Sequence, residues 1–465
     1  MNIIDPVLRQ NPQMRIAIID KDEPGGVCLT RGCIPSKILL YPAELVRTAE
    51  RMSEFGVDVR LNGVDFAKVM LRMRGMIDGE INSIRKGLSE AGENIDYYPV
   101  PAEFIAPYVL RVGNVEIAAP LIFLCTGSKP LIPSVKGLED AGYQTSDTVL
   151  RLKERPKSIA IIGAGYIAAE YGHFFSAMGS KVTIIGRNAR FLREEEPEVS
   201  ALAKRELEKH MRIITGHEVK EVKKGPESKI LVAVNSESRE SMTVAADEVM
   251  VAAGRSSNSD VLHPERGGID TDPAGWIKVN EFLETSQPNV WAFGDANGQQ
   301  YQFKHKANYD SIIVYYNAIL KRPTMVDYHA VPHAVFTYPE IASVGLRETE
   351  AILHYGDENV LIGLERYEDT AKGEAMSLKD YFVKVIVEAS SMKILGAHII
   401  GPYASVLIQE IVNLMYTADQ SATPLIQGMH IHPALTEVVS RAFGGLMPPS
   451  EYHHIMEHQY GLTVK

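Results

Sequence analysis

Short apolar, strand-like runs alternate with longer segments of helical periodicity over most of this chain. The clearest runs occupy residues 15–20, 158–162 and 181–185, and each is rich in isoleucine or valine. Short runs of this kind, separated by helical patterns, are typical of parallel sheets that carry helices on both faces. The pattern therefore predicts an α/β fold.

Breaks in this pattern divide the chain. The charged, proline-containing segment 151–156 is typical of a linker and predicts a boundary near residue 150. Residues 221–251 alternate polar and apolar side chains around turn residues, which predicts a small β-meander inside the second unit. After about residue 268 we expect the chain to return to the first unit, and a last region of mixed strands and helices begins at residue 331.

Composition excludes several functional classes. The chain has 465 residues, 45% of them hydrophobic and 23% charged, which suits two to four globular domains. Its net charge of -11 offers no basic surface for nucleic acid. No apolar run approaches the roughly 20 residues that cross a bilayer, so no membrane partner is expected. Three cysteines, and a first segment without a basic and then apolar leader, favour the cytoplasm.

Two of the three cysteines, Cys28 and Cys33, are separated by four residues in a segment that precedes an apolar helical stretch. About one helical turn apart, they can form a disulfide, and a helix N-terminus lowers the pKa of a thiol toward the reactive thiolate. An inert buried pair or half of a zinc site is the alternative. Zinc needs two further Cys or His ligands at similar spacing, and Cys125 stands alone. The pattern favours redox chemistry.

A glycine-rich turn near the middle of the chain follows a predicted strand and opens a helix. Gly163 permits a tight turn, Gly165 lets backbone amides approach a pyrophosphate, and Ala168 allows the helix to pack closely on the strand. The next strand ends at Gly186, where an acid usually holds the ribose of NAD, and Arg187 follows. This arrangement favours NADPH over NADH, unless Arg187 is an ordinary solvated side chain.

Residues 25–37, with the pattern GGxCxxxGCIPSK, resemble the active-site segment of the flavoprotein pyridine nucleotide-disulfide oxidoreductases, and the likeness extends from about Met14 to about Pro448. The resemblance implies an α/β fold with two doubly wound dinucleotide-binding domains and a C-terminal α+β interface domain. It implies an FAD-binding domain at 1–149, an NAD(P)-binding domain at 150–267, a return segment of the FAD-binding domain at 268–330 and an interface (dimerisation) domain at 331–465.

The resemblance also implies the cofactors FAD and NAD(P)H and the residues that hold them. Lys37 and Glu170 match an ion pair beside the flavin N5. Asp295 matches a carboxylate that binds the ribitol, although it is also suited to cap a helix. Tyr166 matches an aromatic residue over the nicotinamide pocket, or it packs in the core. The cofactor-binding set is Asp20, Lys37, Thr126, Gly127, Gly163, Gly165, Tyr166, Ala168, Glu170, Arg187, Gly254, Gly294 and Asp295.

Residues 430–437 resemble the family's HxHPTxxE pattern, with Ala434 in place of the usual threonine. Glu437 can orient the ring of His432 so that its other nitrogen exchanges protons with a thiol. The resemblance implies that Cys28, Cys33, His432 and Glu437 are the catalytic residues. It also implies a homodimer whose subunits share the two active sites.

These features predict an enzyme that exchanges electrons between NAD(P)H and a dithiol or disulfide through FAD and the Cys28–Cys33 pair. The CIPSK run is most similar to that of dihydrolipoamide dehydrogenase, which acts on lipoyl groups. Gly186 and the Thr30-Arg31 pair depart from that pattern. An NADPH-dependent reductase of a small disulfide, of the glutathione or mycothiol type, is therefore the alternative. A flavin-poor dimeric scaffold is the alternative that is not an enzyme.

Members of this family begin with a strand and a Gly-rich loop for the FAD pyrophosphate, and neither precedes Asn2 here. Asp20 still matches the acid that holds the adenosine ribose of FAD. Because that strand is central in such folds, we expect low stability or weak flavin binding from this sequence, and an incomplete chain start rather than an evolved loss.

Two further patterns are predicted to be structural. The acidic run at 194–198 is typical of a solvated helix start, where acids suit the helix dipole. The HxxEH pattern at 454–458 lacks a third ligand for a metal ion.

Overall fold

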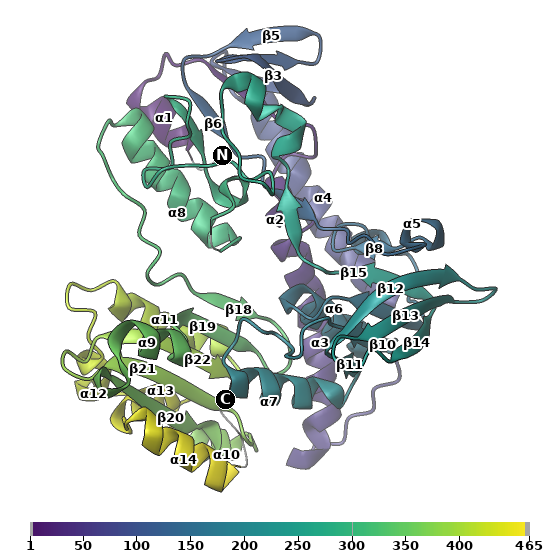
Figure 1. Ribbon diagram of the computed structural model, residues 1–465, viewed down its shortest axis with the longest axis vertical. Coiled ribbons are helices and arrows are strands. Elements are labelled where there is room, and N and C mark those ends of the chain that lie inside the picture. Colours follow the sequence, from purple (N-terminus) through teal and green to yellow (C-terminus); the bar gives the residue numbers. More distant parts are fainter. Residues whose placement is uncertain (1–2, 300, 461–465) are drawn as a thin grey trace.

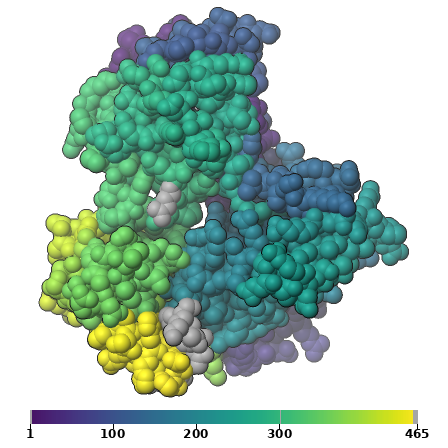
Figure 2. Space-filling view, in the orientation of Figure 1, coloured from purple at the N-terminus to yellow at the C-terminus, as the bar shows by residue number. Residues whose placement is uncertain are grey.

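The computed structural model describes residues 3–299 and 301–460. They form an N-terminal, a central and a C-terminal lobe, each with its own strands (Figure 1). Figure 2 shows the three lobes meeting around a hollow. The α/β fold class expected from the sequence is confirmed. None of the helices described is both long and apolar enough to span a membrane.

The central lobe is built on a complete parallel sheet of five strands in the order β11-β10-β9-β15-β8. Its strands are β8 (Gln144–Thr145), β9 (Ser158–Ile162), β10 (Lys181–Ile185), β11 (Arg212–Ile214) and β15 (Glu248–Val251). β9 lies at the centre, where Ile161 is fully buried, and helix α6 (Tyr166–Ala177) packs against β9 and β10. An antiparallel meander lies between β11 and β15 in sequence, as predicted: β12 (His217–Lys224), β13 (Lys229–Asn235) and β14 (Ser241–Ala246).

The N-terminal lobe has strands of the same kind, but they form two separate parallel pairs. β1 (Ile16–Ile19) pairs with β2 (Ile95–Tyr98), and β6 (Ile122–Leu124) pairs with β17 (Val290–Ala292). In the β6–β17 pair, a strand that follows the central lobe in sequence lies beside a strand that precedes it. Two smaller sheets complete it: β3 (Ala102–Ala106) with β4 (Val109–Val112) and β5 (Val115–Ala118), and β7 (Ser128–Pro130) with β16 (Arg255–Ser257).

The helices of the N-terminal lobe carry the cysteine segment. They are α1 (Ile4–Gln10), α2 (Gly26–Thr30), α3 (Cys33–Arg51), α4 (Phe66–Glu90) and α8 (Lys304–Val314). α3 packs against α4 in its own lobe and against α6 of the central lobe. Phe66, Phe174 and Phe175 form an aromatic group in this contact. The apolar core therefore runs from one lobe into the next and fixes α3 against α6.

The C-terminal lobe is an antiparallel sheet with helices, in agreement with the expected α+β domain. The strand order is β18-β19-β22-β21-β20, with β18 (His333–Val335), β19 (Ile341–Gly345), β20 (Val360–Arg366), β21 (Phe382–Glu388) and β22 (Ile394–Ile400). Its helices include α9 (Glu348–Tyr355), α11 (Ala404–Met415), α12 (Thr423–Gln427), α13 (Thr436–Gly444) and α14 (Pro449–Tyr460).

The prediction of a solvated acidic run at 194–198 is wrong. Glu195, Glu196 and Glu198, at the start of helix α7 (Pro197–Glu208), are all buried. The Lys384 ammonium, fully buried in β21, lies 3.2 Å from Glu196 and 2.5 Å from Glu198. Glu348 of α9 also binds it, at 2.6 Å. The run joins the central and C-terminal lobes, and the cation that pairs with Glu196 and Glu198 lies far along the chain.

Candidate redox active site

The two cysteines predicted to pair form a disulfide, with their Cα atoms 4.9 Å apart. Cys28 lies in the short helix α2, and Cys33 is the first residue of α3, so they belong to two successive helices rather than to one turn of a single helix. At the N-terminus of α3 the helix dipole favours a negative charge on Cys33 once the disulfide is reduced.

Gly32, between the two helices, makes the disulfide geometry possible. A Cβ atom at this position would lie 2.8 Å from the carbonyl oxygen of Val27 and 3.0 Å from the Cα of Cys28. Any side chain would push the end of α2 away from the start of α3. The glycine in the sequence motif is therefore a steric requirement of the close helix-to-helix approach.

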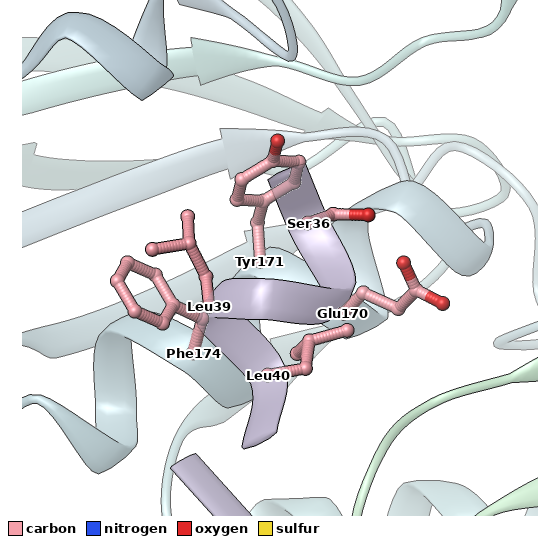
Figure 3. Close-up of a pocket in the computed structure, with 6 residues that line it drawn as sticks. All are labelled: Ser36, Leu39, Leu40, Glu170, Tyr171 and Phe174. Carbon is pink, nitrogen blue, oxygen red and sulfur yellow. The ribbon is translucent and has the colours of Figure 1, made fainter. Parts of the chain in front are cut away.

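Lys37 and Glu170 form the ion pair that the family resemblance implied. The Lys37 ammonium on α3 lies 2.8 Å from both carboxylate oxygens of Glu170 on α6. Glu170 is buried, and Figure 3 shows its carboxylate on the same side as the Ser36 hydroxyl, away from Leu39 and Phe174. The apolar contact between α3 and α6 thus ends at a charged pair, four residues along α3 from Cys33.

Phe336, which the sequence analysis did not single out, contacts both members of this pair. The backbone N–H of Phe336 donates to Glu170 at 3.1 Å, and the Lys37 ammonium lies 4.8 Å from the centre of the Phe336 ring. Phe336 follows β18 in the C-terminal lobe. All three lobes therefore contribute to the surroundings of Lys37.

The segment around Asp295 is held by buried charges. The N–H of Gly294 donates to Asp310 at 3.0 Å, and Asp310 forms a buried ion pair with Lys306 at 2.8 Å. The carboxylate of Asp295 accepts a hydrogen bond of 2.6 Å from Ser128, which in turn accepts from Arg255. Ser128 and Arg255 were absent from the predicted site, although both directly follow predicted glycines.

Two places in the N-terminal lobe, after β1 and after β6, fit bound FAD. Asp20 follows β1, and burial is the main cause of the raised pKa of its carboxyl. Thr126, after β6, has a buried hydroxyl oxygen without a hydrogen-bond partner in the described chain, and Gly127 beside it adopts a φ of 67°. An orphaned polar atom in a turn of this kind suits a bound ligand. Within residues 3–299 and 301–460, the N-terminal lobe has no counterpart of β9 and its glycine turn.

That glycine turn, in the central lobe, has the form needed for a nucleotide. Gly163 has a φ of 121°, and a Cβ there would lie 2.1 Å from the carbonyl oxygen of Ala252. At Gly165, by contrast, a Cβ would meet no atom within 4 Å, so a ligand can approach the backbone at the N-terminus of α6. Ala168 is fully buried, as the close packing of helix on strand requires.

Close packing at the end of β10 explains why position 186 is a glycine and not the acid that usually binds the ribose of NAD. A Cβ at Gly186 would lie 2.4 Å from the Cβ of Ala164 in the glycine turn, so no side chain fits there without a shift. Arg187 is exposed, and no ion pair between it and the described residues is found. Among the described residues, the end of β10 therefore presents an exposed guanidinium without an ion-pair partner, and position 186 has no carboxylate.

Two further predicted residues frame the space between the lobes. Tyr166 is the first residue of α6, and 40% of it is exposed. Its partial burial is the main cause of the raised pKa of its phenol, with Arg255 opposing the effect and Asp295 and Glu170 adding to it. Gly254 begins the return to the N-terminal lobe with a φ of 127°. Both lie where the central and N-terminal lobes meet.

His432 and Glu437 form the predicted dyad, with Nδ1 of the histidine 2.9 Å from the carboxylate. The hydrogen bond from His432, together with one from the N–H of Ala434, lowers the pKa of Glu437, and Arg441 adds to the effect. The His432 side chain is 67% exposed. The dyad lies at the start of α13 in the C-terminal lobe, and the described residues give it no hydrogen bond to α2 or α3.

Comparisons with known proteins agree with this geometry. Residues 7–311 match the protein family described as pyridine nucleotide-disulphide oxidoreductase, and residues 331–443 match its dimerisation domain. Mycothione reductase of Mycobacterium tuberculosis is 36% identical over 450 residues, which cover 93% of this chain and 94% of that protein. Dihydrolipoyl dehydrogenase of Geobacillus stearothermophilus is 33% identical over 437 residues, covering 92% and 90%.

A solved structure has the same fold. The HOCl-induced flavoprotein disulfide reductase RclA from Escherichia coli superposes with a TM-score of 0.82 at 27% identity, over 94% of this chain and 96% of that one. The likeness therefore includes all three lobes.

Proposed function

Because this chain belongs to the pyridine nucleotide-disulphide oxidoreductase family, we propose that it reduces a low-molecular-weight disulfide with NADPH. Family membership makes it an FAD-dependent NAD(P)-disulfide oxidoreductase that acts on sulfur groups. One observation carries the finer assignment: Ala164 excludes a side chain at Gly186, and Arg187 beside it is exposed. A 2′-phosphate suits a free guanidinium, whereas the ribose hydroxyl of NADH meets no carboxylate there.

The proposed chemistry of the chain is thiol–disulfide exchange. When bound, FAD supplies a two-electron relay between the nicotinamide and the Cys28–Cys33 disulfide. Cys33 and Lys37 share one face of α3 at a spacing of four residues, so an ammonium held by Glu170 lies on the thiolate side of that helix. We assign the charge-stabilised thiolate to Cys33 and the attacking thiol to Cys28.

The exchange balances in two steps. The Cys28 thiolate attacks the substrate disulfide, forming a mixed disulfide and releasing one substrate thiolate, which His432 of the partner subunit protonates. The Cys33 thiolate then attacks the sulfur of Cys28, which reforms the Cys28–Cys33 disulfide and releases the second substrate thiolate, and this thiolate takes up the second proton. Two electrons from NADPH and two protons reduce one disulfide to two thiols.

The dyad is proposed to act across a homodimer. The dimerisation domain supports that assembly. Met429 and Ile431, just before His432, are large apolar residues with exposed fractions of 102% and 78%. Apolar side chains this exposed favour burial against a second copy of the chain.

We also propose the domain division 1–149, 150–267, 268–330 and 331–465. The sheets change near the first two boundaries and not at them, since β8 joins the central sheet before residue 150 and β16 pairs with β7 before residue 268. The cytoplasm is the proposed compartment, since thiols there are kept reduced.

A substrate panel tests the proposal. The purified protein is assayed with NADPH and with NADH against mycothiol disulfide and glutathione disulfide, and with NAD+ and NADP+ against dihydrolipoamide. We expect the highest kcat/KM with NADPH and a small disulfide. The CIPSK segment and the likeness to dihydrolipoyl dehydrogenase favour a lipoyl substrate as the second candidate. Faster turnover of dihydrolipoamide with NAD+ would replace our proposal by that one.

A further inference from the structure

We infer that the Glu195–His333 pair is a positioning device that sets the Lys37–Glu170 pair through strand β18 and couples it to the protonation of His333. The inference rests on the site role proposed above for Lys37 and Glu170. It concerns a histidine and an acid that the redox chemistry itself does not use.

Glu195 binds two neighbouring strands of the C-terminal sheet at once. One carboxylate oxygen lies 2.7 Å from Nε2 of His333 on β18, and the other accepts a hydrogen bond of 2.6 Å from Ser343 on β19. His333 and Ser343 are directly paired in the sheet. Because the side chain of Glu195 is only 4% exposed, water competes little for these bonds. The carboxylate therefore clamps the first pair of β18 and β19 to the central lobe.

Strand β18 transmits the position of this clamp to the site. It is a three-residue strand at the edge of the sheet, so β19 alone holds it by strand pairing. Phe336 directly follows it, and its N–H and ring contact Glu170 and Lys37. Only three residues separate His333 from Phe336, whose N–H orients the Glu170 carboxylate. A displacement of His333 therefore moves this hydrogen bond.

The charges around His333 make the clamp pH-dependent. Burial alone would lower the pKa of His333, but the attraction and hydrogen bond of Glu195 outweigh it and raise the pKa, with Glu194 adding to the effect. The pKa of Glu195 is lowered, because His333, Ser343 and His398 of β22 outweigh its burial. His305 of α8 also faces this group and donates to Pro332 at 2.8 Å, and burial lowers its pKa.

The sign follows from these directions. The pair is fully ionised between the lowered pKa of Glu195 and the raised pKa of His333. As the pH rises through the pKa of His333, the imidazolium loses its proton, and the ion pair becomes a weaker hydrogen bond between a neutral ring and the Glu195 carboxylate. Phe303, whose ring stacks on His333 at 6.0 Å, is uncharged and does not replace it.

Amide hydrogen exchange at Phe336 tests the clamp directly, in the purified protein as isolated. The variants are H333Q, which removes the charge, and H333R, which makes it permanent and can still stack on Phe303. H329Q is the control, because it removes another histidine–carboxylate pair, His329 with Asp327, four residues earlier. At pH 7 we expect the protection of the Phe336 amide to fall at least tenfold in H333Q and to stay within twofold in H333R and H329Q.

The pH dependence completes the test. At pH 9.5 the wild-type protection, corrected for intrinsic exchange, should approach that of H333Q, while H333R keeps its value. The visible absorption of bound FAD should shift with the same midpoint in wild type and not in H333R. Equal protection in wild type, H333Q and H333R at both pH values would overturn the inference. Disulfide turnover is measured on the same samples: absence of turnover with this protection pattern refutes the proposed function and not the clamp.

Discussion

Residues 16–19 and 159–162 have the same sequence, Ile-Ala-Ile-Ile, and both form strands, yet their surroundings differ. In β9 of the central lobe all four residues are buried. In β1 of the N-terminal lobe none of them is. β9 has β10 on one side and β15 on the other, whereas the part of the chain described here gives β1 a single neighbour, β2. Burial of a strand is thus decided by its neighbours and not by its own sequence.

The two lobes position their functional residues in different ways, one through a buried strand and the other through packed helices. The central lobe builds its glycine turn directly onto β9, so its ligand site depends on a buried central strand. The redox residues of the N-terminal lobe lie on α2 and α3 instead, and α3 is fixed by packing against α4 and α6. The disulfide site is therefore formed although the strands of its own lobe are in two pairs.

The largest expected effect comes from a substitution that stops disulfide reduction in the N-terminal lobe while the central lobe continues to deliver electrons from NADPH. Cys33→Ser removes the electron acceptor in the N-terminal lobe and should lower disulfide turnover by about a thousandfold or more, or about 4 kcal/mol. Reduction of bound flavin by NADPH, which uses the central lobe, should continue at near the wild-type rate in stopped-flow absorbance. Cys125→Ser, a change at the cysteine outside the disulfide, is the control and should keep both rates. Normal disulfide turnover in Cys33→Ser would refute the redox assignment.

The identical tetrapeptides allow a matched test of burial. Ile161→Ala creates a cavity in β9 and should lower the free energy of unfolding by about 3 to 5 kcal/mol. Ile18→Ala, the equivalent change in half-buried β1, should cost about 1 to 2 kcal/mol. Urea midpoints followed by circular dichroism provide the measurement. Equal shifts for the two variants would show that β1 is as well covered as β9.

Supplying a strand sharpens the same comparison. We expect that a strand and Gly-rich turn of the β9 type, added upstream of residue 1, will pair with β1 and β6. Burial of a strand in that place should stabilise the protein by about 2 to 3 kcal/mol and increase FAD retention. Thermal unfolding and the flavin-to-protein absorbance ratio measure the two effects. An added segment of the same composition in scrambled order is the control, and equal values for both would show that the added strand does not pair with β1 and β6.

The sequence was sufficient wherever chemistry or close packing demands a residue type at a fixed local spacing. Cys28 with Cys33 and His432 with Glu437 are of this kind, since the two members of each pair lie five residues apart. The turn at Gly163 and Gly165 is recognised by its place directly between a strand and a helix. Lys37 and Glu170 are 133 residues apart, and only the resemblance to a family predicted their contact. The roles of these residues stay predictions until variants are measured.

Contacts between lobes were beyond prediction. Glu196 and Lys384 are 188 residues apart, and nothing in the acidic run itself indicates a buried cation. Phe336 acts on Glu170 through its backbone N–H, which every non-proline residue has, so its side chain gives no signal. The sequence of β1 likewise predicts a strand, but it does not predict that β2 is its single neighbour in the part of the chain that the structure describes.

The smallest expected effect concerns the end of β10, which presents Arg187 in place of an acid. Arg187→Glu should shift the preference from NADPH toward NADH, because a carboxylate beside Gly186 repels a 2′-phosphate and accepts hydrogen bonds from a ribose hydroxyl. A charge-assisted contact is worth about 1.5 to 3 kcal/mol, or one to two decades in the ratio of the two kcat/KM values. Lys181→Glu makes the same charge change at the exposed opposite end of β10 and should leave the ratio unaltered. A wild type that already prefers NADH, with a ratio that Arg187→Glu does not move, would mean that Arg187 is only solvated and that the nucleotide is NADH.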